Sequence, residues 1–467
     1  MDKVHTEETN VSRWVLPISI LGSSLGFIDS SVVNIGVPTI QDHLNASLAT
    51  IQWVTNGYLL TLASLVLLGG ATGDRYGSLR VFVIGLIVFA LASIGCGIAP
   101  SAAVLVGARI VQGAGAAFLI PTSLALISQA YKGEARGRAI GTWAAAGGLL
   151  MALGPPFGGF LINVAGWRSI FFINIPLAAL AIYLSGMIRT AGGRLDDRSL
   201  DVPGALLAIA TLAALTYGLI VLGEGMARAG AIAIAAAVPL AVVFLLIEHR
   251  SAMPMMPLKL FGSRTFAGAN ALTVILYGGL GAAIFMLPFS MIRAHHYSSI
   301  AAGLAFLPLS LILGLGSRLS GSLADAVGNR LPLTIGPLIA GAGFATLALS
   351  ANGENYATTF LPGLLIVGLG MTLAVPALTT AVFDSVADSD SGAASGINNA
   401  AARTGSLLAT AALGIAFGSE RMAAMSIEVL TSAYTSVMWC AALASAASAV
   451  IAFVSISKGN GSHEKAH

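Results

Sequence analysis

Long apolar stretches alternate with short polar or Gly- and Pro-rich breaks along the whole of this chain. A helix that crosses a bilayer needs about 20 mostly apolar residues. Divided at the breaks, the sequence contains fourteen runs of roughly that length, at 14–37, 51–72, 80–99, 103–128, 139–162, 169–188, 202–222, 230–247, 266–290, 300–320, 332–350, 357–382, 395–417 and 432–456. We expect each run to form a membrane-spanning α-helix.

The composition agrees with lipid as the main solvent. Of 467 residues, 56% are hydrophobic and only 9% are charged, against about 25% charged in soluble domains. A soluble protein of this length would lack the polar residues to face water. The net charge of +3 and the lack of a lysine-rich tail argue against nucleic-acid binding. The polar segment 1–10 has no basic region followed by a cleavage site, so no removable signal peptide is expected.

The two cysteines, Cys96 and Cys440, lie far apart in the sequence and inside apolar runs. We expect them to be buried thiols that act as small hydrophobic residues, not a disulfide or a metal site. The sequence indicates no cofactor and no metal.

A short internal repeat supports the count of runs. Gly, Asp and Gly recur at the same offsets in 70–80 and 321–330, which places Asp74 and Asp325 251 positions apart. Spread over eight spans, this distance gives about 31 residues per helix and turn, whereas six spans would need about 42 and long loops. We therefore predict an all-α membrane protein with a six-helix bundle at 1–200, a two-helix transmembrane linker at 201–250 and a second six-helix bundle at 251–467.

The distribution of Lys and Arg predicts the orientation. With an even number of spans, sixteen basic residues lie on the side of the N-terminus and four on the other side. Loops rich in Lys and Arg stay in the cytoplasm. We expect both termini to be cytoplasmic and the protein to lie in the plasma (inner) membrane.

Two segments combine glycines with charged residues or prolines, and both suit helices that move against each other. The loop at 70–80 carries Asp and Arg at helix ends, where they can pair across the two bundles and separate when that side opens. This predicted latch comprises Gly70, Asp74, Arg75, Gly77, Arg80 and, in the second copy, Asp325. In the fifth run, glycines four residues apart allow close helix approach, and two prolines remove backbone donors. This segment contains Gly154, Pro155, Pro156, Gly158 and Gly159.

These segments resemble a known family. The loop at 70–77 resembles the signature loop of the major facilitator superfamily, although Ser78 and Leu79 stand where a basic pair is usual. The segment 147–159 resembles the motif that separates the antiporters of that superfamily from its other members, and 27–38 and 166–176 resemble motifs of its fourteen-helix drug:proton antiporters. The resemblance implies export of small molecules by alternating access.

Few ionisable residues lie inside the runs, and each costs at least ~2.5 kcal/mol in hydrocarbon. Asp29 and Arg109 each lie about 13 Å from the predicted outer surface, so they pair if both face the same cavity. We expect Asp29 to carry the coupling proton, or else to make a static hydrogen bond between helices. Arg109, in a stretch similar to a family motif linked to proton transfer, either assists or only contacts helix-end carbonyls. Arg318 is expected to snorkel to the membrane surface or to anchor the nearby loop.

Other polar and aromatic residues within the runs are candidates for binding a substrate. They are Asn34, Asn56, Tyr58, Gln112, Trp143 and Arg403, the last of which suits an interhelical bond equally well. The ranges 265–383 and 395–417 have no acidic residue well inside a span. This favours neutral, weakly cationic or anionic compounds over dicationic ones.

The sequence therefore predicts a proton-coupled exporter of small lipophilic molecules whose partners are substrate, protons and lipid, and which acts as a monomer. An uptake symporter of the same fold is the alternative, and sodium as the coupling ion stays open. A membrane enzyme would need clustered catalytic groups at one depth, and an ATP-driven pump would need a Gly-x-x-x-x-Gly-Lys-[Ser/Thr] loop, which the chain does not contain.

Overall fold

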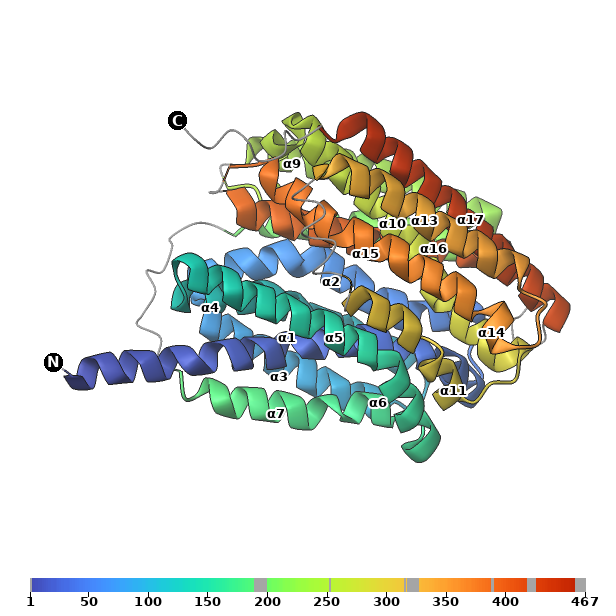
Figure 1. Ribbon diagram of the computed structural model, residues 1–467, viewed down its shortest axis with the longest axis horizontal. Helices are drawn as coiled ribbons and strands as arrows, with labels where there is room; N and C mark the ends of the chain where they lie inside the picture. Colours follow the sequence, from blue (N-terminus) through green and yellow to red (C-terminus); the bar gives the residue numbers. More distant parts are fainter. Residues whose placement is uncertain are drawn as a thin grey trace.

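The computed structural model describes residues 2–188, 200–251, 253–314, 316, 327–387, 390–417 and 426–457, and within these ranges the chain is helical with no β-strand (Figure 1). The helices are α1 (Asp2–Leu44), α2 (Leu48–Tyr76), α3 (Ser78–Gly97), α4 (Ala102–Ala130), α5 (Gly133–Ala165), α6 (Ser169–Phe172), α7 (Asn174–Ser185), α8 (Val202–Gly223), α9 (Ala227–Arg250), α10 (Arg264–Phe289), α11 (Ser299–Leu304), α13 (Arg330–Leu349), α14 (Tyr356–Thr359), α15 (Leu361–Asp384), α16 (Ser391–Phe417) and α17 (Ile427–Ser455), with a short 3-10 helix at Leu258–Gly262 and a π-helical turn at Ser290–Ala294.

Eleven helices within the described ranges are long and apolar enough to span a bilayer. Two shorter apolar helical segments, Ser169–Ser185 and Ser299–Gly314, lie at two further predicted runs. The remaining run is α16, which has 27 residues and is therefore about 40 Å long. The prediction of an all-helical membrane protein is confirmed.

The helices begin and end where the sequence supplies capping groups. Ser47, Ser101 and Ser263 precede α2, α4 and α10, and each side chain accepts a hydrogen bond from a backbone N–H of the first turn. Gly77 and Gly166 end α2 and α5 with φ of 93° and 76°, a region that favours glycine. We call the end of the bundle at Gly77 the Gly77 end, and the opposite end, which holds Trp167, the Trp167 end.

The helices form two groups that lie side by side along the long axis of the molecule (Figure 1). One group contains α1 to α7 and the other α10 to α17, and α2 with α16 and α5 with α11 are the main contacts between them. α8 packs on both α2 and α16, whereas α9 contacts chiefly α8 and is largely exposed. The two helices at 202–250 thus lie outside both groups, and α8 covers the seam.

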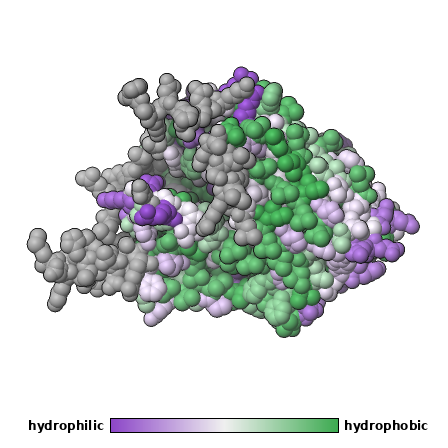
Figure 2. Space-filling model, in the orientation of Figure 1, coloured by the Kyte–Doolittle hydropathy of each residue, from purple (hydrophilic) through white to green (hydrophobic). Residues whose placement is uncertain are grey.

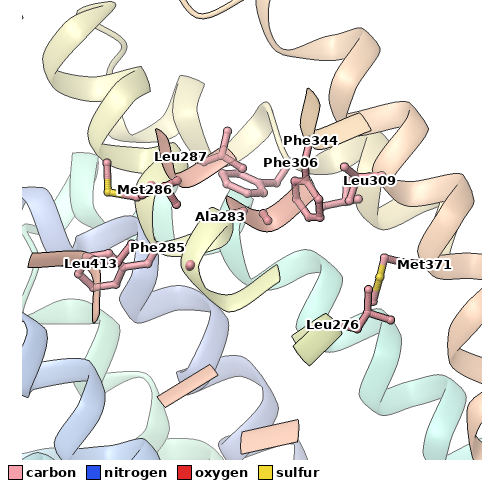
Figure 3. Packing of buried hydrophobic residues seen from close by; sticks show 14 of the residues in the cluster. Leu276, Ala283, Phe285, Met286, Leu287, Phe306, Leu309, Phe344, Met371 and Leu413 are labelled. Carbon is pink, nitrogen blue, oxygen red and sulfur yellow. The ribbon is translucent and has the colours of Figure 1, made fainter. Parts of the chain in front are cut away.

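The surface and the core show the distribution expected in lipid. Apolar residues form a broad band over the visible face, with polar residues gathered toward its ends (Figure 2). Inside the second group, apolar side chains from neighbouring helices interdigitate (Figure 3). Phe306 and Leu309 meet Phe344 of α13, while Phe285 of α10 lies beside Leu413 of α16 (Figure 3).

Several details differ from the sequence predictions. The expected helix at 169–188 is divided at Ile173 into α6 and α7. By contrast, α5 continues through Pro155 and Pro156 to Ala165, as the run at 139–162 predicts. Cys96 is buried as expected, but Cys440 is exposed on α17, so the prediction of two buried thiols is wrong for that residue.

Candidate functional site

Asp29 of α1 and Arg109 of α4 form an ion pair inside the first helix group. Both residues are almost fully buried, at 1% exposure each. Sequence alone gave these residues the same depth, and the structure shows that they also face each other. They lie between helices of one group, and the pair is sealed from solvent in this conformation.

A network of amide and hydroxyl groups surrounds the pair. The Gln112 side chain accepts from Arg109 Nη1 (2.6 Å) and donates to Asp29 Oδ1 (2.9 Å) and Ser93 Oγ (2.8 Å). Asn174 Nδ2 also lies 3.3 Å from both Asp29 Oδ1 and Ser93 Oγ. Four helices, α1, α3, α4 and α7, thus contribute to one polar cluster around a single carboxylate.

Arg109 makes further contacts that compensate its burial. Its Nε donates to the Val54 carbonyl oxygen of α2 at 3.1 Å, and its guanidinium carbon lies 4.2 Å from the centroid of the Tyr58 ring. Buried charges persist in proteins only when they are paired and hydrogen-bonded. The cation therefore has a counter-ion, a carbonyl and an aromatic face.

Ser93 and Asn174 belong to this cluster but were not among the residues predicted from the sequence. Asn174 lay within the segment 166–176 that resembled a family motif, but no role was inferred for it. The signal that would have found both is a polar side chain within an apolar helix, since such groups need a partner. Gln112 and Tyr58, predicted as substrate contacts, are both buried against Arg109.

The other predicted substrate residues are dispersed. Asn34 is half-buried and donates to the Ser30 carbonyl at 3.1 Å. Asn56 is fully buried on α2, and within the described ranges its side-chain amide has no hydrogen-bond partner. Trp143 is buried with its ring 5.9 Å from Phe27, and Arg403 is half-buried on α16.

The predicted latch is described only in its first copy. Gly70 and Gly73 face α4, where added Cβ atoms would lie 3.6 Å from Pro121 Cβ and 2.9 Å from Thr122 Cγ2. Asp74 and Arg80 are exposed at the Gly77 end. Asp325 of the second copy and Arg318 both lie outside the described residues.

The glycines of the predicted antiporter motif pack α5 on two sides. Cβ atoms at Gly154 and Gly158 would lie 1.8 Å from Ser31 Oγ and 2.8 Å from Val32 Cγ1, both on α1. A Cβ at Gly159 would lie 2.2 Å from the Ser299 carbonyl oxygen of α11. The motif therefore joins α5 to its own group and, through Gly159, to the other group.

The two groups meet closely at the Trp167 end. A Cβ at Gly303 of α11 would lie 2.3 Å from the Pro155 carbonyl oxygen, which mirrors the contact at Gly159. Gln52 of α2 donates to the Thr410 carbonyl of α16 at 2.7 Å, and Arg293 pairs with Asp42 across the groups. This end of the molecule is closed in the structure.

We expect the Asp42–Arg293 pair to contribute modestly to that closure. An exposed ion pair contributes roughly 0.2–1 kcal/mol and weakens with salt, so Arg293→Ala should shift the equilibrium toward separation of α5 and α11 by at most about fivefold. The readout is the distance between spin labels at Val164→Cys and Leu304→Cys, two exposed positions on α5 and α11, in a chain with Cys440→Ser. If the shift in label distance does not depend on ionic strength, the ion pair does not have this role. The exchanged pair, Asp42→Arg with Arg293→Asp, serves as the control.

Comparisons with known proteins agree with this architecture. The sequence profile of the Major Facilitator Superfamily matches residues 19–410. The methylenomycin A resistance protein of Streptomyces coelicolor is 33% identical over 406 residues, 85% of each chain. The multidrug resistance protein Stp of Mycobacterium tuberculosis is 34% identical over 84% of this chain and 74% of its own. The tetracenomycin C resistance and export protein of Streptomyces glaucescens is 32% identical over 86% of this chain and 75% of its own.

Solved structures show the same fold at low sequence identity. A bacterial homologue of the human lysosomal transporter Spinster superimposes with a TM-score of 0.65 at 18% identity, over 95% of this chain and 97% of that one. The xylose transporter XylE of E. coli gives 0.65 at 14% identity, over 94% and 98%. The fold, the profile and the relatives together lead to one conclusion: this multi-pass membrane protein belongs to the major facilitator superfamily, a family of transporters and not of enzymes.

Proposed function

We propose that the protein exports small lipophilic molecules, among them antibiotics, in exchange for protons. The observation that carries the proposal is the buried Asp29–Arg109 pair with its shell of amides. Asp29 is the one acidic residue of the sequence that lies deep within a predicted span. Asp29 is a carboxylate paired with a cation, in a site that lipid and protein seal from water. These properties suit a residue that must bind and release a proton as access alternates between the two sides of the membrane.

The relatives support the direction and the class of compound. The relatives at 32–34% identity are named as a methylenomycin A resistance protein, a multidrug resistance protein and a tetracenomycin C resistance and export protein. Gly154, Gly158 and Gly159 join α5 tightly to α1 and α11, which agrees with the resemblance of this segment to an antiporter motif. Substrate contacts in this proposal come from Asn34, Asn56, Trp143 and Arg403.

The topology belongs to the same proposal. Eleven long apolar helices, the two shorter segments and α16 support fourteen crossings with both termini in the cytoplasm, so the Gly77 end is the cytoplasmic end. The bundles comprise 1–200 and 251–467, with 201–250 as the linker. The loop at Gly70, Asp74, Arg75, Gly77 and Arg80, together with Asp325, acts as the cytoplasmic latch.

Inside-out membrane vesicles that contain the protein provide the test. With an acidified lumen, methylenomycin A or tetracenomycin C added outside should enter the lumen while protons leave, and the lumenal pH should rise. Vesicles without the protein, and vesicles treated with a protonophore, are the controls. Entry of protons and compound in the same direction would favour the uptake symporter instead, and export that ignores the pH gradient would refute proton coupling.

A further inference from the structure

The linker hairpin carries two buried carboxyl groups at its Gly77 end. Asp201 directly precedes α8, and Glu248 lies in the last turn of α9; their exposures are 8% and 2%. The sequence placed both at the edge of their spans, and no role was inferred for either. Because α9 extends to Arg250, Glu248 belongs to the helix and is packed against the start of α8.

One oxygen of each carboxyl group has a backbone donor. Asp201 Oδ1 accepts from Gly204 N at 2.9 Å and so caps α8, while Glu248 Oε2 accepts from Met256 N at 3.0 Å. The other two oxygens, Asp201 Oδ2 and Glu248 Oε1, are buried and have no hydrogen-bond partner among the residues that the structure describes.

These two unpartnered oxygens face the same point. Each lies 2.8 Å from the position that a Cβ on Gly204 would occupy, so they are no more than 5.6 Å (twice 2.8 Å) apart. Two ionised carboxylates that share a buried site repel each other, and one of them keeps its proton instead. A single proton would turn one oxygen into a donor to the other and would satisfy both.

The charged groups around the pair do not replace that proton. The pair borders a cavity of about 780 Å³ whose charged lining consists of Asp74, Arg75, Asp201, Glu248, His249, Lys259 and Asp390. Lys259 pairs with Asp390 at 3.1 Å, and Arg75 lies 5.3 Å from the Tyr76 ring centroid. No ion pair between a cation and Asp201 or Glu248 occurs in the part of the chain that the structure describes.

We propose that Asp201 and Glu248 form a second proton-binding site, which holds one proton between the two carboxyl groups and fastens the start of α8 to the end of α9. Through Met256 the same site ties the hairpin to the segment that leads into α10. Loss of the proton leaves two negative charges in a buried place and loosens the hairpin at this end. The site is separate from Asp29, and its existence does not depend on the proposed export.

Infrared spectroscopy of the purified full-length protein in lipid nanodiscs tests the proposal directly. Near neutral pH we expect a band from a protonated carboxylic acid that is retained in Asp29→Asn and lost in both Glu248→Gln and Asp201→Asn. The matched control is Glu224→Gln, the same substitution on an exposed residue at the other end of the hairpin, which should keep the band. Absence of the band in the unaltered protein, or its survival in Glu248→Gln, would overturn the proposal.

Thermal unfolding provides the second readout. The unfolding temperature of the unaltered protein should fall by several degrees as the pH rises from about 5 to about 9, because ionisation of the second carboxyl group creates the repulsion. Glu248→Gln carries a permanent amide donor toward Asp201, so its curve should be nearly flat, whereas Glu224→Gln should follow the unaltered protein. Equal slopes in the two variants would refute a shared proton, and a slope removed by sodium at constant ionic strength would identify a metal-cation site instead.

Discussion

Replacing Asp29 by asparagine is expected to abolish proton-driven export and to destabilise the protein. Asparagine keeps the size of Asp29 but carries no titratable proton, and an NH2 donor replaces one of the two acceptor oxygens. It also leaves the guanidinium of Arg109 buried without its counter-ion, and removal of one partner of a buried pair costs about 3–5 kcal/mol. The measurements are compound-driven proton movement in vesicles and the unfolding temperature of the purified protein.

A double variant separates these two effects. Asp29→Asn with Arg109→Gln removes both charges, so it should regain much of the lost stability while transport stays absent. If Asp29→Asn still exports a compound uphill in response to a pH gradient, Asp29 is not the proton carrier. If the double variant transports as well as the unaltered protein, the buried pair serves only to hold the helices together.

Adding one methyl group at Gly159 is expected to open the Trp167 end. The new Cβ of Gly159→Ala would meet a backbone carbonyl of α11 at 2.2 Å, and a backbone atom cannot rotate away as a side chain can. Overpacking of this kind costs about 1–3 kcal/mol, which corresponds to a shift of roughly 5- to 150-fold toward a state in which α5 and α11 separate. Spin labels at Val164→Cys and Leu304→Cys report that separation.

Gly148 supplies the matched control on the same helix. In the part of the chain that the structure describes, no atom beyond the adjoining backbone of α5 lies within 4 Å of a Cβ placed there. Gly148→Ala should therefore leave the label distances unchanged and stabilise α5 slightly. Equal behaviour of the two variants would show that close contact at Gly159 does not govern the closed state. Because transport requires both states, we also expect Gly159→Ala to slow export.

Sequence alone could predict the features that depend on local composition. The apolar runs indicated helices because lipid requires the backbone to be satisfied within each segment. The depth of Asp29 and Arg109 followed from counting residues to Pro38 and Pro100. Their mutual contact needed one more fact, the rotation of each helix about its own axis, which the packing of α1, α4 and α7 determines.

Contacts between residues far apart in the chain could not be predicted from the sequence for the same reason. Asn174 donates hydrogen bonds to Ser93 and to Asp29, which lie 81 and 145 positions away in the chain. The facing carboxyl groups of Asp201 and Glu248 come together only because the hairpin turns back on itself. Cys440 looked buried because its neighbours are apolar, but in a membrane protein an apolar surface also faces lipid.

The seam between α2 and α16 has a mechanical consequence. Near the Trp167 end Gln52 donates to Thr410, and fifteen residues further along α2, about 22 Å away, Leu67 fills the space that a side chain at Gly396 would take, with Leu67 Cδ2 2.6 Å from that position. Two contacts at different positions along one pair of helices define an axis. Two rigid bodies that stay in contact along an axis can rotate about it, so α2 and α16 form a hinge. With α2 and α16 as the axis, α5 and α11 become the free edge, so a small rotation produces its largest displacement at Gly159 and Gly303.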